Sequence, residues 1–454
     1  MRALVYGTGM TGIAHALSLA EAGVCVTLAG ASDSFAGGWS SDDISLGGKN
    51  FTLPRGIRLP VLSGTSLDRK FFSEEVNSEI EYYSYKTWTE EGCIVGEFSN
   101  KEISCIDLSG LQLTPQSLVD ELKSVGRREV NCEQDRLEKT YGKTIVEQVF
   151  QPLAQPRFGS SLEFLPPSTM DGLIPKRFVL PETFYAAAGK SSSKVPTTIM
   201  AARTRTELET IPHLPVIYPV GVSLSAWVSR LKKTLSMNGV NVELNCPLEN
   251  INLTGSQDRI DVRLNGEDLS FDLLLCAVPP ISILKAITPT LADRVNIKPG
   301  DFRCFSIAHI ECSGKTTSTN EFVNNFCPSS KSHRYKLWQN FKAHRIQENI
   351  ITVELASLAS DGMDVQTGAQ HAIDELIAYG YLSKDSEITD IALLENIGKI
   401  PVFSIPQVNE LNAVAQKLNQ LHPKLSIVSS NSVKFLHQIL CDADVFTKDI
   451  QKAA

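Results

Sequence analysis

The stretch Arg2-Ala3-Leu4-Val5-Tyr6-Gly7-Thr8-Gly9-Met10-Thr11-Gly12 decides the fold of this chain. It joins a short apolar run to a Gly-x-Gly-x-x-Gly sequence, and residues 13–22 then repeat apolar side chains at helical spacing. The first glycine permits a tight bend, the second lets the backbone approach a phosphate, and the third lets the helix pack on the strand. We therefore predict a strand, a phosphate-binding turn and a helix, followed by a second buried strand over Val24–Leu28.

This turn is predicted to hold the pyrophosphate of a dinucleotide. The contacting residues are expected to be Gly7, Gly9, Met10, Thr11 and Gly12. The second strand of such a unit normally ends in an acidic residue that binds ribose hydroxyls, but Gly30 stands at that position and Asp33 is the next acid. Asp33 is the candidate ribose ligand. No Arg or Lys lies between Arg2 and Lys49 to neutralise a ribose phosphate, which argues against a phosphorylated nicotinamide cofactor.

Composition narrows the class of protein. The chain has 454 residues, long enough for two domains, and its net charge of −8 argues against a nucleic-acid surface. Ten scattered cysteines, without a Cys-x-x-Cys pair or a Cys-His group at ligand spacing, indicate reduced thiols and no metal site. The chain opens directly on a strand and has no apolar run as long as a membrane span, so we expect a cytoplasmic protein.

Several later motifs follow in a characteristic order. They are the Gly-Gly-x-x-Ser loop at 37–41, the Tyr-Pro-x-Gly segment at 218–221 before a helix, the Gly-Val-x-Val-x-Leu-Asn-x-Pro-Leu-x-x-Ile strand at 239–251, and the Asp-x-Leu-Leu-x-Ala-Val-Pro-Pro strand at 272–280. Residues 258–278, which overlap the start of the last motif, read as a hairpin around Asn265-Gly266, with one buried strand over Leu269–Val278. This order resembles the flavin-dependent amine oxidase, protoporphyrinogen oxidase and UDP-galactopyranose mutase superfamily.

The resemblance implies an α/β fold, in which a Rossmann-type (GR2-like) FAD-binding domain carries an inserted, mixed α+β substrate domain. It implies FAD as the cofactor. The FAD domain would comprise residues 1–70, 211–280 and 396–454, and the substrate domain residues 71–210 and 281–395. By the same resemblance, further cofactor contacts would come from Gly37, Gly38, Trp39, Ser40, Leu248, Ser430 and Asn431. Ser430 and Asn431 depart from the family, which places a charged residue there.

The middle of the chain resembles the mutase branch. The segment from Leu137 through Pro152 to Gly159 is similar to the helical substrate region of those enzymes. The mutases hold a nucleotide-sugar diphosphate with arginines, and guanidinium groups grip phosphate oxygens in a bidentate way. By resemblance, the substrate-binding candidates are Arg177, Arg303 and Arg334.

Three functions remain open from the sequence. The first is an FAD-dependent oxidoreductase or isomerase acting on a small molecule, such as a nucleotide-linked sugar or a secondary metabolite. The second is a homologue that has lost flavin and serves as a binding or partner protein, and the third is an NAD(P)-dependent reductase. The catalytic residues stay unknown, although His344 and His437 are candidates for the cleft, whereas His15 and His309 are expected to be packing residues. We expect no nucleic-acid partner, and a homo-oligomer is compatible with the sequence.

Overall fold

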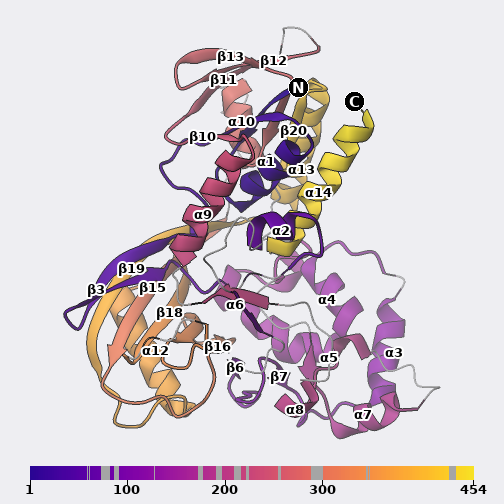
Figure 1. Ribbon diagram of the computed structural model, residues 1–454. Helices are drawn as coiled ribbons and strands as arrows, with labels where there is room; N and C mark the ends of the chain where they lie inside the picture. The colour runs from indigo at the N-terminus through magenta and orange to yellow at the C-terminus, as the bar shows by residue number, and fades with distance from the viewer. Residues whose placement is uncertain are drawn as a thin grey trace.

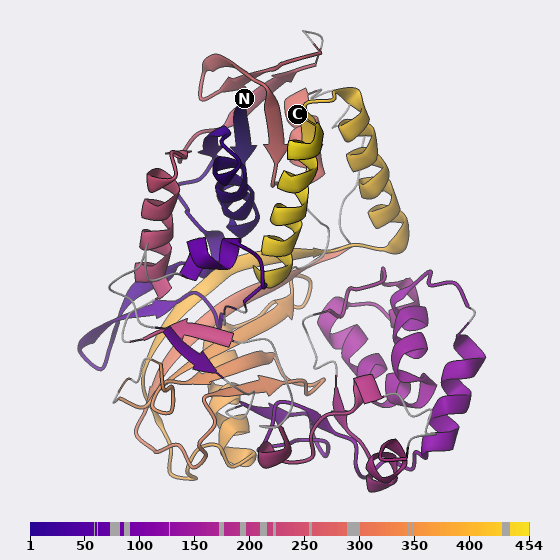
Figure 2. The same cartoon turned by 45° about the vertical axis from the view of Figure 1, so that its right-hand side comes forward.

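In the computed structural model, a parallel sheet with its helices forms one end of the molecule. A larger sheet and a group of short helices lie side by side at the other end (Figures 1 and 2). The structure describes residues 1–58, 60, 62–72, 82–85, 91–126, 128–171, 177–190, 197–208, 216–220, 224–253, 257–287, 300–343, 346, 348–428 and 436–453.

Five strands form the parallel sheet. In order across the sheet they are β10 (Asn241–Glu243), β2 (Cys25–Ala29), β1 (Arg2–Tyr6), β14 (Leu273–Cys276) and β20 (Leu425–Ile427). All four pairings are parallel, although the strands come from three distant parts of the chain. The carboxyl ends of all five strands therefore meet at one edge, where ligands bind in open α/β sheets. The predicted Rossmann-type α/β fold is confirmed.

Alternating side chains of these strands enter two different cores. Ala3 and Val5 of β1 pack in one core, and Leu4 and Tyr6 pack in the other. The first face carries α1 (Met10–Glu21), α9 (Leu224–Met237) and α14 (Leu436–Ala453). The second face carries α10 (Pro280–Ile287), α13 (Ile405–Leu421) and the antiparallel strands β11 (Leu248–Asn252), β12 (Ile260–Leu264) and β13 (Glu267–Phe271). A sheet covered on both faces explains why its strands read as continuous apolar runs.

The expected single strand over Leu269–Val278 is wrong, because the chain divides there into β13 and β14, which belong to different sheets. Asp272 lies at the division, where its carboxylate accepts a hydrogen bond of 2.6 Å from the backbone N–H of Arg2. The predicted hairpin turn is confirmed, since Asn265 and Gly266 both have positive φ angles, of 49° and 81°.

The second sheet has six strands, mostly antiparallel. In order they are β19 (Ile388–Val402), β15 (Asp301–Cys312), β18 (Ile350–Leu358), β17 (Ser332–Leu337), β16 (Phe322–Asn325) and β6 (Glu91–Ile94). Helix α12 (Val365–Ala378) covers one face, against which Ala308 and Ile310 pack. The hairpin of β3 (Ser41–Leu46) and β4 (Lys49–Pro54) packs on the other face, in the core shared with Trp338 and Ile350. This second face carries the candidate site.

Short helices form the group beside this sheet (Figure 2). They are α3 (Pro115–Val125), α4 (Glu133–Tyr141), α5 (Lys143–Ile145), α6 (Gln151–Phe158) and α7 (Glu182–Ala188). Thr114 caps α3 by accepting a hydrogen bond from the N–H of Ser117. Helix α6 ends at Gly159, which has a φ of 64°, and its last turn contacts β15 and β18. This contact brings α6 to the candidate site.

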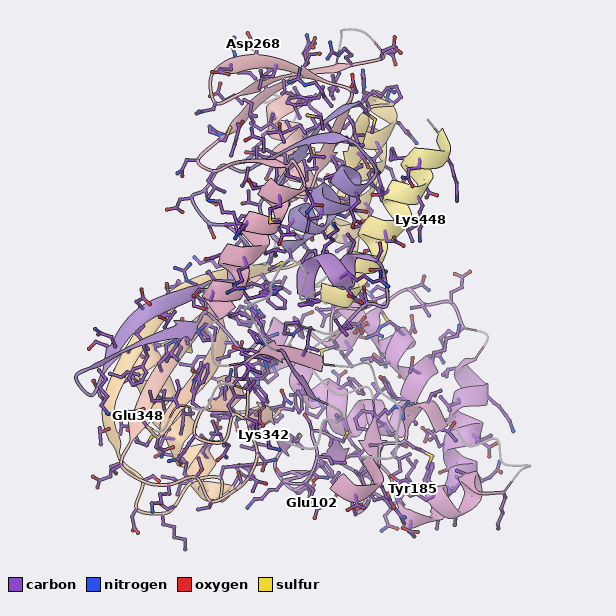
Figure 3. All side chains as sticks on the ribbon, in the orientation of Figure 1. Glu102, Tyr185, Asp268, Lys342, Glu348 and Lys448 are labelled. Atoms are coloured by element: carbon purple, nitrogen blue, oxygen red, sulfur yellow. The ribbon has the colours of Figure 1, made fainter. Side chains whose placement is uncertain are left out.

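Smaller elements connect these parts. They are α2 (Leu67–Phe72), α8 (Arg205–Leu208), the strand pair β5 (Tyr82–Tyr85) with β9 (Val216–Pro219), and the strand pair β7 (Ile106–Asp107) with β8 (Phe178–Val179). Charged side chains such as Asp268 and Lys448 lie on outer surfaces (Figure 3), where Lys448 pairs with Asp444. Within the described ranges, no helix is long and apolar enough to cross a membrane.

Candidate functional site

The glycine turn, residues Gly7–Gly12, joins the end of β1 to the start of α1. Gly7 has a φ of 126°, and a Cβ on it would lie 2.8 Å from the carbonyl oxygen of Ala277. A Cβ on Gly12 would lie only 1.7 Å from the carbonyl oxygen of Gly7. A Cβ on Gly9, in contrast, would meet no atom within 4 Å. Gly7 and Gly12 are therefore needed for packing, whereas Gly9 faces open space.

The Gly-Gly loop lies beside this turn. Ala36 donates its backbone N–H to the carbonyl oxygen of Thr8 at 2.9 Å, which fixes the start of a short helical turn, η1 (Gly37–Trp39). The Ser40 hydroxyl donates to the carbonyl oxygen of Gly37 at 3.0 Å. The Trp39 ring packs against Trp227 of α9. The structure thus brings the predicted residues of the turn and the loop together.

The end of β2 differs from an ordinary dinucleotide site. A Cβ on Gly30 would lie 2.8 Å from both Oγ1 and Cγ2 of Thr8, so the Thr8 side chain occupies the space in which an acidic side chain would begin. Asp33, the predicted ribose ligand, is exposed three residues further on. The glycine turn therefore fits a pyrophosphate, but the strand end does not fit the usual ribose contact.

Leu248 was predicted to contact the cofactor. Its N–H donates to the hydroxyl oxygen of Tyr6 at 3.0 Å. Tyr6 is 8% exposed, and burial raises the pKa of its phenol, although the bond from Leu248 opposes this shift. The predicted contacts Ser430 and Asn431 lie outside the described residues, as do His344 and the side chain of His437.

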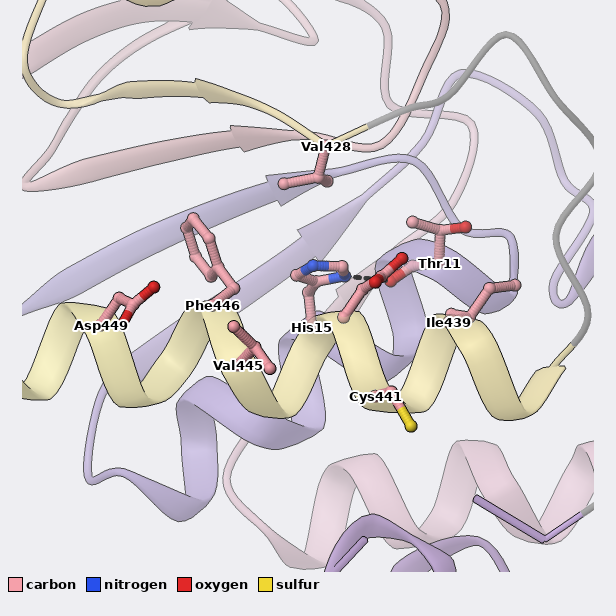
Figure 4. A pocket seen from close by; sticks show the side chains of 9 residues that line it. Thr11, His15, Val428, Ile439, Cys441, Val445, Phe446 and Asp449 are labelled. Atoms are coloured by element: carbon pink, nitrogen blue, oxygen red, sulfur yellow. Dashed lines mark hydrogen bonds between the residues drawn. The ribbon is translucent and has the colours of Figure 1, made fainter. Parts of the chain in front are cut away.

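A cleft of about 390 Å³ lies between α1 and α14, close to the turn (Figure 4). Thr11 and Val428 line one side, and His15, Ile439 and Phe446 line the rest together with residues further along α14. His15 donates from Nδ1 to the carbonyl oxygen of Thr11 at 2.8 Å, and its ring meets Phe446 edge to face. His15 is 2% exposed, which agrees with the expected packing role.

A cationic cluster lies on the second face of the six-stranded sheet. It consists of Arg58, Arg157, Arg303, His333 and Arg334, with Glu354 as its acid. Strand register pairs Arg334 with Glu354, and their side chains form an ion pair of 2.8 Å. Arg58 approaches the same carboxylate at 3.4 Å. Burial alone would raise the pKa of Glu354, but the two guanidinium groups outweigh burial and hold it below its ordinary value.

Glu354 also links the cluster to the predicted cofactor loop. Its Oε1 accepts a hydrogen bond of 2.6 Å from the backbone N–H of Ile57. The Nη2 of Arg58 would lie 3.5 Å from a Cβ on Gly38. A path therefore runs from Gly38, beside which Arg58 lies, through the ion pairs of Arg58 and Arg334 with Glu354.

Two arginines of the cluster are buried with unmatched donors. Arg303 is 4% exposed, and its Nε and Nη2 have no hydrogen-bond partner. Arg157 is 6% exposed; its Nη2 donates to three backbone carbonyls, but its Nη1 has no partner. Burial, and for Arg303 also the nearby charge of Arg157, lowers the pKa of Arg303 to about 9 and that of Arg157 to about 10.

Two aromatic rings and a neutral histidine, but few acids, surround Arg303 and its neighbours. Its guanidinium carbon lies 5.0 Å from the ring centroid of Phe305 and 5.9 Å from that of Phe158. Burial, followed by four nearby arginines, lowers the pKa of His333 well below its ordinary value, so this ring is neutral. Among the described residues, the acids acting on these arginines are Glu354 and Glu375, so cations outnumber anions.

The third predicted arginine does not join the cluster. Arg177 is exposed and donates to the carbonyl oxygen of Met200 at 3.4 Å, at the start of β8. Sequence reasoning also missed four members, Arg58, Arg157, His333 and Glu354. Glu354 left a signal, because it is the single charge in the apolar strand Ile350–Leu358. Arg157 left no such signal in the sequence. A cation in the last turn of a helix is favourable by itself, so an arginine at this position does not indicate a site.

His309 is a core residue, as expected. It is fully buried, and its Nδ1 lies 2.8 Å from the hydroxyl oxygen of Thr352, which also accepts a hydrogen bond from Trp338 Nε1. Its Nε2 has no partner. Burial lowers the pKa of His309 to about 3, so the ring stays neutral and gives no cationic base.

Lys336 lies two residues beyond Arg334, on the same face, and was not singled out from the sequence. Its Nζ lies 3.5 to 5.6 Å from the ring centroids of Phe341, Trp338, Tyr218 and Phe322. The residue is 2% exposed, and burial lowers the pKa of its amine well below 10.5. The aromatic rings stabilise a cation, but they cannot replace its lost hydration.

Lys336→Met is expected to remove a pH dependence of stability. The unfolded lysine binds its proton up to about pH 10.5 while the folded one releases it earlier, so wild-type stability rises with pH toward that value. The titration of Lys336 makes the free energy of unfolding rise by up to about 1.4 kcal/mol per pH unit. Urea unfolding at pH 7 and pH 9 measures this difference, and the exposed Lys232→Met is the control. Equal slopes in wild type and Lys336→Met would show that the buried amine stays protonated.

Comparison with known proteins agrees with this architecture. No protein-family model matches the sequence, and no curated protein sequence is similar to it. Many solved structures align over nearly the whole chain, and three of them serve as examples. They are a reduced UDP-galactopyranose mutase (13% identity, TM-score 0.67, 100% of this chain and 94% of that chain), a protein proposed to be a protoporphyrinogen oxidase from Exiguobacterium sp. 255-15 (13%, 0.58, 100% and 99%) and a double mutant of putrescine oxidase (11%, 0.60, 99% and 98%).

At these identities the likeness establishes the fold, and substrate and reaction must be argued from this chain's own residues. The chain has the fold shared by UDP-galactopyranose mutase, protoporphyrinogen oxidase-like proteins and putrescine oxidase, which confirms the superfamily fold predicted from its sequence.

Proposed function

We propose that this protein is a flavin-dependent oxidoreductase or isomerase acting on a small molecule that carries an anionic group. The observation that carries the proposal is the path from Gly38 through Arg58 and Glu354 to Arg334. Along this path a cationic sheet face adjoins a dinucleotide-type glycine turn. A flavin near Gly38 would therefore lie next to groups that bind an anion.

The glycine turn would hold the pyrophosphate of FAD. The space in front of Gly9 is open, and the first backbone N–H groups of α1 point toward it. When bound, flavin would supply hydride transfer, which no protein side chain provides, or would serve as a nucleophile in its reduced form. The mutase and the putrescine oxidase named above make both reaction types reasonable for this fold.

The arginines would recognise the substrate. Arg303 and Arg157 hold unmatched donors in a buried region, and an anion placed between them would satisfy those donors. Arg334 and Arg58 are about one third exposed, so they mark the more open side of the cluster. Glu354 would fix the guanidinium group of Arg334 and keep its planar fork oriented. A carboxylate or phosphate fits this set of donors.

One observation favours the alternative of a homologue without flavin. The Tyr6 hydroxyl takes the N–H of Leu248, and Thr8 fills the space over Gly30. Both features remove contacts to the adenosine half of FAD. A chain with an intact sheet and a poor cofactor site would serve as a binding or partner protein.

The absorption spectrum of the purified protein decides between these functions. A flavoenzyme is expected to show the visible absorption bands of flavin, and to release FAD on denaturation and filtration. Reconstitution with added FAD should restore the bands in a colourless preparation. A protein that stays colourless after reconstitution would contradict the flavoenzyme proposal and support the binding-protein alternative.

Arg303→Met is expected to abolish most of the stabilisation of the protein by phosphate, without lowering its stability in the absence of phosphate. Phosphate at about 100 times its dissociation constant should stabilise the wild type by about 2.7 kcal/mol. The variant should lose most of this stabilisation, and its melting temperature without phosphate should not fall, because an unpaired buried charge is removed. Thermal unfolding with phosphate, or with chloride at equal ionic strength, measures both. The exposed Arg177→Met is the matched control and should retain the phosphate effect; an equal loss in both variants would contradict the assignment.

A further inference from the structure

Thr8 occupies the point between the carboxyl ends of β1 and β2. It is 7% exposed, and its hydroxyl donates to the carbonyl oxygen of Ser34 at 2.9 Å. Its own carbonyl oxygen accepts the N–H of Ala36 at 2.9 Å. Both ends of the residue are therefore tied to the loop that follows β2, so the side chain cannot move aside without breaking a hydrogen bond.

Gly30, below Thr8, is fixed equally firmly. Its N–H donates to the carbonyl oxygen of Glu243 at 3.0 Å, and its carbonyl oxygen accepts the N–H of Cys246 at 2.8 Å. A Cβ at position 30 would lie 2.8 Å from two atoms of Thr8, a distance that real Cβ atoms do not tolerate. Because the backbone is held from both sides, position 30 cannot carry a side chain while Thr8 is present.

The adjacent adenine side is closed by a similar contact. The N–H of Leu248 is satisfied internally by the Tyr6 hydroxyl at 3.0 Å. A backbone donor that already has a buried partner gains little from a ligand that must displace it. Thr8 and Tyr6 extend from neighbouring positions of β1 and its turn. Thr8 therefore stands where the acidic ribose ligand of a dinucleotide site would begin, and Tyr6 already satisfies the N–H of Leu248.

We propose that Thr8, lying over Gly30, replaces the acidic ribose ligand of this fold and closes the ribose position, so that this chain holds a flavin dinucleotide through its pyrophosphate and flavin parts with little contribution from adenosine. The inference rests on the proposed flavin function and specifies which part of the ligand is recognised. It identifies Thr8 as the side chain that keeps a ribose ligand out of position 30.

The proposal is tested by moving the side chain from position 8 to position 30. Thr8→Ala, Gly30→Glu and the double variant Thr8→Ala/Gly30→Glu are compared with wild type. Dissociation constants for FAD and FMN are measured by flavin fluorescence, and folding by thermal unfolding. FMN is the control ligand because it lacks the adenosine and the phosphate attached to it, and therefore cannot reach position 30.

The double variant is expected to bind FAD about tenfold or more tightly than wild type, since a carboxylate that accepts ribose hydroxyls forms charge-assisted hydrogen bonds. Its affinity for FMN should stay unchanged. Gly30→Glu alone should be destabilised, because Thr8 remains in place. Thr8→Ala alone should change FAD affinity less than threefold, because it creates space without a ligand.

Three outcomes separate this inference from the proposed function. If wild type binds FAD much more tightly than FMN and the double variant gains nothing, the Thr8 inference is overturned while the flavin function stands. If only the double variant binds FAD, the closure of the ribose position by Thr8 stands, but the native flavin function fails, and with it the claim that this chain holds a flavin dinucleotide. If no variant binds either flavin, both are wrong. Should the glutamate variant not fold, Thr8→Ala/Gly30→Asp replaces it, and failure of both to fold would overturn the inference.

Discussion

Gly12→Ala is expected to lower the free energy of unfolding by about 3 kcal/mol or more, whereas Gly9→Val should fold as wild type does. A Cβ on Gly12 would lie 1.7 Å from the carbonyl oxygen of Gly7, so α1 would have to move away from β1. Residues of α1 such as Ile13 and Leu17 are completely buried against the sheet, and that movement would open their core. The loss comes from a backbone clash that no rotamer change can relieve.

Urea unfolding followed by circular dichroism measures this contrast. Gly9→Val is the matched control, because a Cβ on Gly9 meets no atom within 4 Å. Its side chain would instead enter the open space in front of α1 and abolish dinucleotide binding. Equal stability of Gly12→Ala and wild type would show that the helix does not pack as described. Unchanged FAD affinity in Gly9→Val would contradict the assignment of the phosphate site.

Glu354→Gln is expected to cost about 3 kcal/mol of stability at pH 7, because it removes one partner of a buried ion pair. Its carboxylate accepts from Arg334 at 2.8 Å and from the N–H of Ile57 at 2.6 Å, and its side chain is 5% exposed. An amide in this place would offer a donor to the guanidinium donors of Arg334 and Arg58. Both of these cations would then remain without a counterion.

The same residue predicts a pH dependence. The folded pKa of Glu354 lies below its unfolded value near 4.5, so the unfolded state binds more protons over this interval. The stability that the carboxylate contributes is complete above about pH 4.5 and is lost as pH falls through the folded pKa. Unfolding measurements from pH 7 to pH 3 should show a steeper loss in wild type than in Glu354→Gln.

Glu348→Gln provides the surface control. Glu348 pairs with Lys49 at 2.6 Å, but the lysine side chain is 63% exposed, so the pair is screened by water. Its removal is expected to change stability by less than about 1 kcal/mol. Similar losses in the two glutamine variants would mean that Glu354 is no more important than an exposed carboxylate.

Local sequence predicted several elements because the signal and the structure lie in the same few residues. The unit from β1 through the glycine turn to β2 is one example. The turn at Asn265-Gly266 is another, since these residues readily adopt the positive φ angles that a two-residue hairpin requires. The predicted strand over Leu269–Val278 was wrong because the apolar run hides the point at which the chain changes sheets.

The candidate site was predictable only in part. Resemblance indicated Arg303 and Arg334, which the structure places on one face of one sheet, but it also indicated Arg177, which lies outside the cluster. Arg157 could not have been found, because its importance arises from the contact of α6 with β15 and β18. These two strands begin more than 140 residues after α6 in the sequence. The closure of Gly30 by Thr8 likewise requires two residues from different strand ends.

The sequence by itself determined the Rossmann-type fold and the glycine turn between β1 and α1, because strand periodicity and glycine spacing act within short segments. Only the tertiary structure decided which charges meet. Register between β17 and β18 pairs Arg334 with Glu354, and packing of α6 brings Arg157 toward Arg303. Burial then leaves Arg157 and Arg303 with unmatched donors. Removing water makes such an unpaired guanidinium group costly.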